Sequence, residues 1–299
     1  MSDEPELDDE PVARPRPTFL VTKEYHRFAE FADACRRNHY IGVCYGPPGV
    51  GKTLSARHFA CWDDIKDRLT EQRTTLGADI PPDLADCHTL VYTPKVAATP
   101  RHLSDDLLQL SYNSNELVRT AWQAAGLAPL TRRSVVELLI VDEADRLKMP
   151  EPEEIRDRYD CANLFDGVGV LLIGLPGIEK RLTRYAQLYS RVGFVHHFQP
   201  LSKEEPRFIL AHKWREVGLT FSPDDWTDTE ALATIARITG GIFRMVQRLF
   251  AQIERVLEIN QLRTITTEVV ETARESLVIG PLARTLLRHQ ALKIYDRLR

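Results

Sequence analysis

Short runs of apolar residues recur along the first 200 residues of the chain, and stretches with helical periodicity separate them. Five of these runs are apolar almost throughout, which is typical of strands buried on both faces. They are YIGVCY (40–45), HTLVYT (88–93), VELLIVD (136–142), GVGVLLIG (167–174) and GFVHHF (193–198). Strands that alternate with helices in this way predict an α/β fold, with a parallel five-stranded sheet between helices.

After Pro200 the pattern contains no further strand. The spacing of the apolar residues instead predicts four helices, at 202–217, 228–239, 242–259 and 265–277. We therefore expect an α/β domain over residues 19–200 and a smaller, all-helical domain over residues 201–276. The polar segment 62–86, which contains the Pro81–Pro82 pair, is expected to be an irregular linker.

Both ends of the chain differ in charge from the rest. Residues 1–18 are rich in acids and prolines, and they bury too little apolar surface to offset the entropy of ordering, so we expect a disordered tail. The segment 277–299 is basic. Its cations suit a contact with DNA or with an acidic partner, and they suit a solvated helix face equally well. They are Arg284, Arg288, Lys293, Arg297 and Arg299.

The composition of the 299 residues, with 43% hydrophobic and 27% charged residues, is ordinary for a globular protein. The net charge of −4 does not indicate a nucleic-acid-binding protein, although a local basic surface is compatible with it. None of the five cysteines forms a C-x-x-C pair, which favours reduced thiols over disulfides or a zinc site. The sequence has no uninterrupted apolar run of about 18 residues, so we expect no membrane span and a cytoplasmic location.

A phosphate-binding loop follows the first predicted strand and precedes a helix. The segment GPPGVGKT (46–53) has the pattern G-x-x-x-x-G-K-T in the strand–loop–helix context that this motif requires. We expect Lys52 to reach the β- and γ-phosphates of a nucleotide and Thr53 to place its hydroxyl on Mg²⁺. The residues expected to bind the nucleotide are Gly46, Pro47, Pro48, Gly49, Val50, Gly51, Lys52, Thr53 and Leu54.

Two acids end the third predicted strand, in LLIVDEAD (138–145). Ligands of parallel sheets bind at the carboxyl ends of the strands, so we expect both acids to face the phosphates. Asp142 would hold Mg²⁺, and Glu143 would activate the attacking water. This pair favours ATP hydrolysis. The sequence has no N-K-x-D motif of a GTPase, and the region after residue 200 lacks the arginine cluster that a metabolite kinase would need.

The phosphate loop, VDEADRL and the helical region together resemble an AAA+ ATPase over residues 19–276. Three segments are most similar to the transposition regulators of the TnsC, TniB and MuB kind: IVDEADRLK, GVGVLLIGLPGIEKRL and LYSRVGFVHHFQPLS. The resemblance implies a DNA-binding ATPase of a bacterial nucleoid that forms a ring or a helical filament on duplex DNA. It also implies ATP and Mg²⁺ as cofactors, and a transposase and a target-selecting protein as partners.

The resemblance also assigns roles to two arginines. Arg191, in LYSRV, corresponds to an arginine finger that contacts the γ-phosphate held by a neighbouring subunit. Arg244, which follows the Gly240–Gly241 pair, corresponds to the arginine by which the helical lid contacts the γ-phosphate of its own subunit. One feature departs from the family. The fourth strand should end in a polar sensor residue, but Gly174–Pro176 provide no polar side chain, which predicts slow hydrolysis.

Other contacts are implied by the resemblance alone. The adenine is expected near Val21, Tyr25 and His26, before the first strand. The loop YTPKVAATPRHL (92–103) corresponds to a loop that faces DNA in the transposition regulators. Contacts with the DNA backbone are expected from Lys95 and Arg101, with hydroxyl contacts from Thr93 and Thr99, and a weaker case is made by Arg132 and Arg133. Two cations form no patch by themselves, so a solvated loop stays an alternative.

Three functions therefore stay open. The first is an ATP-dependent regulator of DNA transposition, whose assembly on DNA requires ATP and whose hydrolysis drives disassembly. The second is an AAA+ loader in replication or repair, which shares the same motifs. The third is a secretion or signalling ATPase of the ExeA type, which does not bind DNA.

Overall fold

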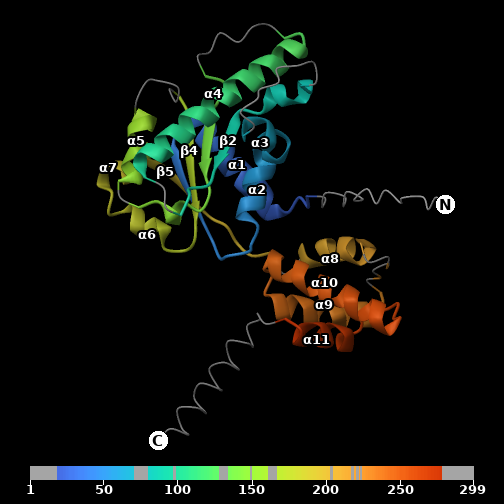
Figure 1. Cartoon of the computed structure of the whole chain (residues 1–299). Helices are drawn as coiled ribbons and strands as arrows, with labels where there is room; N and C mark the ends of the chain where they lie inside the picture. The colour runs from blue at the N-terminus through green and yellow to red at the C-terminus, as the bar shows by residue number, and fades with distance from the viewer. Residues whose placement is uncertain are drawn as a thin grey trace, which may run out of the picture.

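The computed structural model describes most of the 299-residue chain (Figure 1). The described residues are 19–70, 80–96, 99–127, 134–148, 150–160, 167–202, 205–216, 219, 222 and 224–277. The acidic segment 1–18, the pair Arg132 and Arg133, and the basic cations from Arg284 onwards lie outside them. Among the described helices, none combines the length and the apolar character needed to cross a membrane.

A five-stranded parallel sheet organises the first domain, as predicted. Its strands are ordered β2-β3-β4-β1-β5, and every neighbouring pair is parallel. The strands are β1 Ile41–Tyr45, β2 Thr89–Tyr92, β3 Leu138–Val141, β4 Gly169–Gly174 and β5 Val192–His197. This order places the end of β1, where the phosphate loop starts, directly beside the end of β4.

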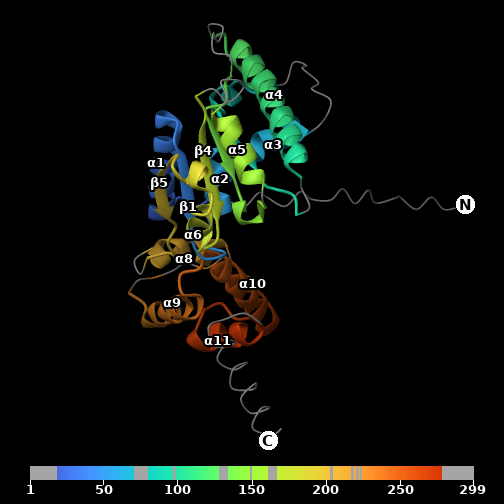
Figure 2. The ribbon, with the colours of Figure 1, turned by 90° about the vertical axis from the view of Figure 1, so that its left-hand side faces the viewer.

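Helices cover both faces of the sheet (Figure 2). Successive residues of a strand point to opposite faces, so Leu139 and Ile140 of β3 belong to two different cores. One face packs against α1 Lys23–Asn38 and α2 Lys52–Phe59. The other face packs against α3 Trp62–Thr70, α4 Pro100–Ala124, α5 Glu151–Asp160, α6 Ile178–Leu182 and α7 Ala186–Tyr189.

The edge strand β5 differs from the other four strands. Its residues are alternately half-buried and exposed, and Val195 is 58% exposed. The strand has a neighbour on one side only and is covered on one face, by α1, where Phe31 stacks on His196. A strand that is half-covered alternates in exposure, whereas the other four strands, including β2 at the opposite edge, are buried almost throughout.

The segment 62–86 is not the irregular linker that its polar composition suggested. It contains α3 and the 3₁₀ turn η1 Pro82–Asp86. Ile65 and Leu69 lie one helical turn apart on α3 and are both fully buried against the sheet. Charged residues surround these two positions, so a short apolar stripe was hidden in a window that is polar on average.

A separate helical lid follows the sheet domain, as predicted (Figure 1). Its helices are α8 Glu205–Glu216, α9 Trp226–Thr239, α10 Phe243–Asn260 and α11 Thr267–Glu275. The lid has its own core, in which Trp214 meets the ring of Phe250 edge-on. One backbone hydrogen bond attaches the lid directly to the phosphate loop of the first domain, from Arg244 N–H to Gly49 O over 2.9 Å. A second, from Leu201 N–H to Gly241 O over 3.0 Å, holds the start of the helical region against the end of α9.

Candidate nucleotide-binding site

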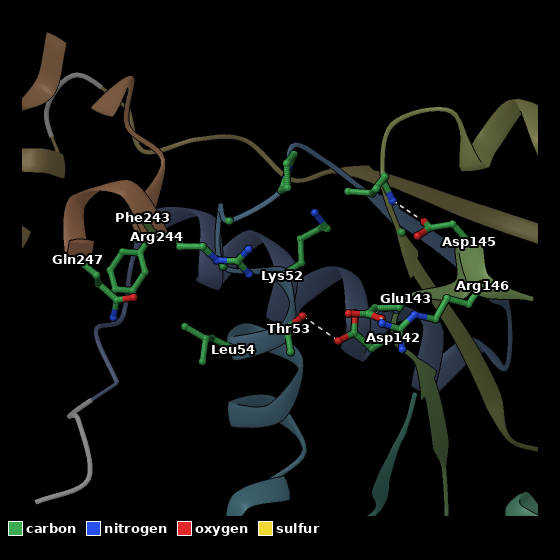
Figure 3. A pocket seen from close by; sticks show the side chains of 15 residues that line it. Lys52, Thr53, Leu54, Asp142, Glu143, Asp145, Arg146, Phe243, Arg244 and Gln247 are labelled. Carbon is green, nitrogen blue, oxygen red and sulfur yellow. Dashed lines mark hydrogen bonds and ion pairs between the residues drawn. The ribbon is translucent and has the colours of Figure 1, made fainter. Parts of the chain in front are cut away.

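A cavity of about 380 Å³ opens at the carboxyl edge of the sheet, between the sheet domain and the lid (Figure 3). Four segments line it: the phosphate loop with the start of α2, the end of β3 with the 3₁₀ turn η2 Ala144–Arg146, the end of β4, and the first turn of α10. The cavity therefore collects residues that are far apart in the sequence.

Three positions of the phosphate loop require glycine, two because of their backbone angles and one because a side chain would clash. Gly49 has φ 82° and Gly51 has φ 115°, a region that residues with a side chain rarely adopt. A Cβ on Gly46 would come within 2.3 Å of the carbonyl oxygen of Phe198, which follows β5. The loop then enters α2, whose first residue is Lys52 and whose N-terminus attracts anions.

Lys52 is folded back into the loop. Its Nζ donates hydrogen bonds to Gly46 O over 2.7 Å and to Pro47 O over 2.9 Å. Burial lowers the pKa of its ammonium, and the nearby carboxylates of Asp142 and Asp145 partly oppose this shift. A buried ammonium that is bound mainly by neutral carbonyls is poorly compensated, so an anion in the cavity would stabilise its charge.

Thr53 and Asp142 form the pair expected of a magnesium site. Thr53 Oγ1 donates to Asp142 Oδ2 over 2.7 Å, and Asp142 is buried. One hydroxyl and one carboxylate are hard oxygen ligands, and Mg²⁺ typically takes one or two such groups together with substrate phosphates and water. The described residues contain no cluster of three or more His, Cys, Asp or Glu side chains that could hold a metal alone. The residues present thus fit a metal shared with a nucleotide.

Glu143 lines the same cavity in an unusual backbone conformation. Its φ of 52° is left-handed, and its N–H donates to Asp142 Oδ1 over 2.9 Å. Its carboxylate is paired with Arg146, and both side chains are about two-fifths exposed. An ion pair with that exposure contributes at most about 1 kcal/mol, so a bound phosphate could draw Arg146 away from Glu143 and leave the carboxylate to a water molecule. Strained backbone conformations of this kind cluster at active sites, although His39 and Gln261 adopt the same conformation simply as helix C-caps.

The lid contributes Arg244 to the cavity, and its predicted contact with the γ-phosphate stays a prediction. Gly240 and Gly241 end α9 in left-handed conformations, and Arg244 lies on the first turn of α10. Its guanidinium points towards the phosphate loop (Figure 3). Phe243 and Gln247 also line the cavity and were not predicted. Gln247 lies three residues after Arg244 on the same helix, so helical spacing could have found it.

Arg191 lies outside the cavity of its own subunit. It follows α7 and precedes β5, and its Nε donates to Asp160 Oδ1 over 2.6 Å. The guanidinium of Arg191 is the main reason why the pKa of Asp160 is lowered. Among the described residues, the structure therefore brings Lys52, Thr53, Asp142, Glu143 and Arg244 together and leaves Arg191 apart.

A second cavity, of about 610 Å³, adjoins the first and shares Gly51, Leu54, Phe243 and Gln247 with it. Phe19 and His58 line it and stack at a centroid distance of 3.8 Å with their rings within 10° of parallel. Val21, Tyr25 and His26, the residues expected near an adenine, are not among the described residues that line it. Phe19, His58 and Phe198 were missed because they come from three distant segments.

The loop expected to contact DNA is only partly described, because residues 97 and 98 lie outside the described ranges. Lys95 Nζ lies 2.9 Å from Asp106 Oδ2. Thr99 caps α4 by accepting a hydrogen bond from His102 N–H over 3.3 Å. Arg101 is exposed on the first turn of α4. Lys95 and Thr99 thus already have partners in their own subunit.

The strand order, the loop after β1 and the lid arginine in one cavity define a P-loop protein of the AAA+ fold. The model of the AAA domain family matches residues 35–182. A potential ATP-binding protein of Staphylococcus aureus is 45% identical over 268 residues, which cover 88% of this chain and 97% of the relative. The chain therefore belongs to the same family as this protein, and the AAA domain match together with the name of this relative supports ATP binding.

Two solved structures have a similar fold. The RuvB Holliday junction branch migration motor of Thermotoga maritima has a TM-score of 0.59 at 17% identity, covering 93% of this chain and 78% of RuvB. The ADP form of the ORC2 protein of Aeropyrum pernix has a TM-score of 0.52 at 15% identity, covering 89% of this chain and 71% of ORC2. Identities this low establish the shared AAA+ fold and no more.

Proposed function

We propose that this protein is an ATP hydrolase that assembles with ATP on duplex DNA and regulates a transposase. One observation carries the hydrolase part of the proposal. Lys52, the Thr53–Asp142 pair, Glu143 and Arg244 face a single cavity, although they come from three segments that are far apart in the sequence. Phosphoryl transfer to water requires positioning and charge neutralisation, and these groups supply both.

In this mechanism, the oxygen of a water molecule forms a bond to the γ-phosphorus. The bond from that phosphorus to the bridging oxygen breaks, and ADP leaves with the electron pair. Glu143 accepts the proton of the attacking water. Lys52 and Arg244 neutralise the charge that develops on the phosphate oxygens. Mg²⁺, held by Thr53 and Asp142, would supply further charge neutralisation at the phosphates.

A second subunit would complete the site. Arg191 does not line the cavity of its own subunit, and its side chain is about one-third exposed beside Asp160. It would exchange Asp160 for the γ-phosphate of a neighbouring subunit. Hydrolysis would then require assembly, and hydrolysis would weaken the interface, which suits an ATP-controlled switch.

The DNA part of the proposal rests on the resemblance to transposition regulators and on Arg101, which is exposed. Lys95 is 68% exposed in its pair with Asp106, so it could exchange this partner for a DNA phosphate at little cost. An oligomer would repeat these cations along the backbone, which is how a chain with a net charge of −4 could still bind DNA. RuvB, which has the same fold, is described as a motor that acts on Holliday junctions.

The proposal is tested by electron microscopy and fluorescence anisotropy on duplex DNA, with ATP, ADP or a non-hydrolysable analogue. We expect rings or filaments on DNA only with a triphosphate, and weaker binding by Arg101→Ala than by Arg263→Ala, an exposed arginine of the lid. Assembly without DNA affinity would favour the secretion or signalling ATPase. Assembly on DNA, without a transposase gene beside the gene of this chain, would favour the loader.

We further propose that the nucleoside of ATP enters the second cavity. His58→Ala should weaken ATP and ADP binding about tenfold, because it removes one of two stacked rings in that cavity. The matched control is His26→Ala, since His26 is exposed and does not line the cavity. The nucleotide affinities of both variants are measured by titration with a fluorescent nucleotide. A larger loss of nucleotide affinity in His26→Ala would instead favour an adenine site near Val21, Tyr25 and His26, as the resemblance implied.

A further inference from the structure

We propose that Asp145 is a further catalytic carboxylate, which accepts a hydrogen bond from the water that attacks the γ-phosphate. The inference rests on the proposed ATP hydrolysis and deepens it. Asp145 lines the nucleotide cavity together with Lys52 and Glu143 (Figure 3). Neither the family match nor the resemblance assigns it a role.

The position of the Asp145 carboxylate is set by the end of β4. Its Oδ1 accepts a hydrogen bond from Leu175 N–H over 2.6 Å, drawn as a dashed line in Figure 3. Leu175 directly follows β4, whose last residue Gly174 pairs with Tyr45 at the end of β1. The carboxylate therefore lies at the sheet edge next to the phosphate loop, where the fourth strand itself has no polar side chain.

Gly174 makes the space for this carboxylate. A Cβ on Gly174 would lie 2.2 Å from Asp145 Oδ1 and 2.6 Å from Ile178 Cδ1. Its φ is not left-handed, so this glycine is not required for its backbone angles. The end of β4 thus carries no side chain, and the carboxylate of Asp145 occupies the space that a side chain there would fill.

A third residue holds the turn that carries Asp145. Arg181 of α6 donates from Nη1 to Asp145 O over 2.6 Å, and from Nη2 to Ala144 O over 2.9 Å and to Leu147 O over 3.2 Å. Hydrogen bonds from a charged donor are stronger than neutral ones. The backbone of η2 is therefore fixed from the side of α6 before any nucleotide binds.

The chemistry of a carboxylate restricts what Asp145 can contact. An ionised carboxylate only accepts hydrogen bonds, and phosphate oxygens also only accept them, so the two cannot bond to each other directly. Besides water, the donors that line this cavity include Lys52, Arg146 and Arg244, and Asp145 helps to stabilise the charge of Lys52. In the hydrolysis step, Glu143 takes one proton of the attacking water, while Asp145 accepts a hydrogen bond from its other O–H and takes no proton. Two acceptors would then fix the direction of attack.

The decisive variant is Asp145→Asn. Its amide oxygen must stay on Leu175 N–H, so its NH₂ group would face the cavity and replace an acceptor by a donor. We expect kcat to fall about 100-fold. We also expect ATP to bind about fivefold more tightly relative to ADP, because a negative charge near the γ-phosphate is removed. Asp157→Asn, an exposed acid of α5, is the matched control.

Gly174→Ala provides a second variant that leaves Asp145 unchanged in the sequence. Its Cβ should displace the carboxylate and lower kcat to a similar degree, in a protein whose melting temperature shows that it is folded. Steady-state hydrolysis and titrations with ATP and ADP are measured on both variants. Wild-type kcat and an unchanged ATP preference in Asp145→Asn would overturn the role of Asp145 alone. A wild-type protein that never hydrolyses ATP would overturn the proposed hydrolysis as well.

Discussion

Glu143→Gln is expected to bind ATP with near wild-type affinity and to hydrolyse it about 1,000-fold more slowly. The change keeps the size of the side chain but removes the group that accepts the proton of the attacking water. Lys52, Thr53, Asp142 and Arg244, which contact phosphate or metal in the proposed mechanism, are unchanged. The two effects are separated by measuring the ATP dissociation constant and the single-turnover hydrolysis rate on the same preparation.

The same variant should form assemblies that persist in ATP, because hydrolysis is the proposed signal for disassembly. Light scattering after removal of free ATP follows their lifetime. Glu230→Gln changes an exposed glutamate of the lid helix α9 and should behave as the wild type does. Normal turnover and normal disassembly of Glu143→Gln would refute the role given to Glu143.

Arg191→Ala should lower the hydrolysis rate about 1,000-fold while leaving ATP binding by the isolated subunit unchanged. The reason is that Arg191 lies beside Asp160, away from the cavity of its own subunit, and is proposed to act on the nucleotide of the next one. Arg184→Ala is the matched control, since Arg184 is an exposed arginine of the same segment. ATP affinity at concentrations below assembly is compared with hydrolysis above it.

Mixing two inactive variants tests whether Arg191 acts in trans. In an assembly of Arg191→Ala and Glu143→Gln subunits, some interfaces combine an intact Glu143 with an intact Arg191 from the neighbour. We expect these mixed assemblies to regain hydrolysis that neither variant shows alone. If the mixture stays as inactive as its components, Arg191 does not complete a neighbouring site, and its pairing with Asp160 is its main role.

The elements that depend on local sequence were predicted well. All five strands were found within two residues of their ends, because each is a short apolar run whose burial on both faces leaves a strong signal. The helix α3 was missed because only a few buried positions, among them Ile65 and Leu69, mark it within a charged segment. Those two side chains are buried by long-range contacts with the sheet, which the composition of the segment does not reveal.

The residues of the site also fall into two groups, those that the sequence predicted and those that it did not. Gly46–Thr53 and the Asp142–Glu143 pair could be predicted from the sequence, because a phosphate loop and a strand end are each built from consecutive residues. The lining of the second cavity could not, because Phe19, His58 and Phe198 meet only after α1, α2 and β5 have packed together. Val21, Tyr25 and His26 do not line this cavity, although Tyr25 packs against both Phe19 and His58, and their contact with an adenine stays a prediction.

The sequence by itself determined the sheet, the lid and the phosphate-binding chemistry of this protein, since apolar periodicity and contiguous motifs encode them locally. Only the tertiary structure decided which side chains complete the site. Asp145 belongs to the same short segment as Asp142, yet its place beside Gly174 depends on the pairing of β3 with β4 and on the hydrogen bonds from Arg181. Contacts between distant segments follow from packing, which no single stretch of sequence specifies.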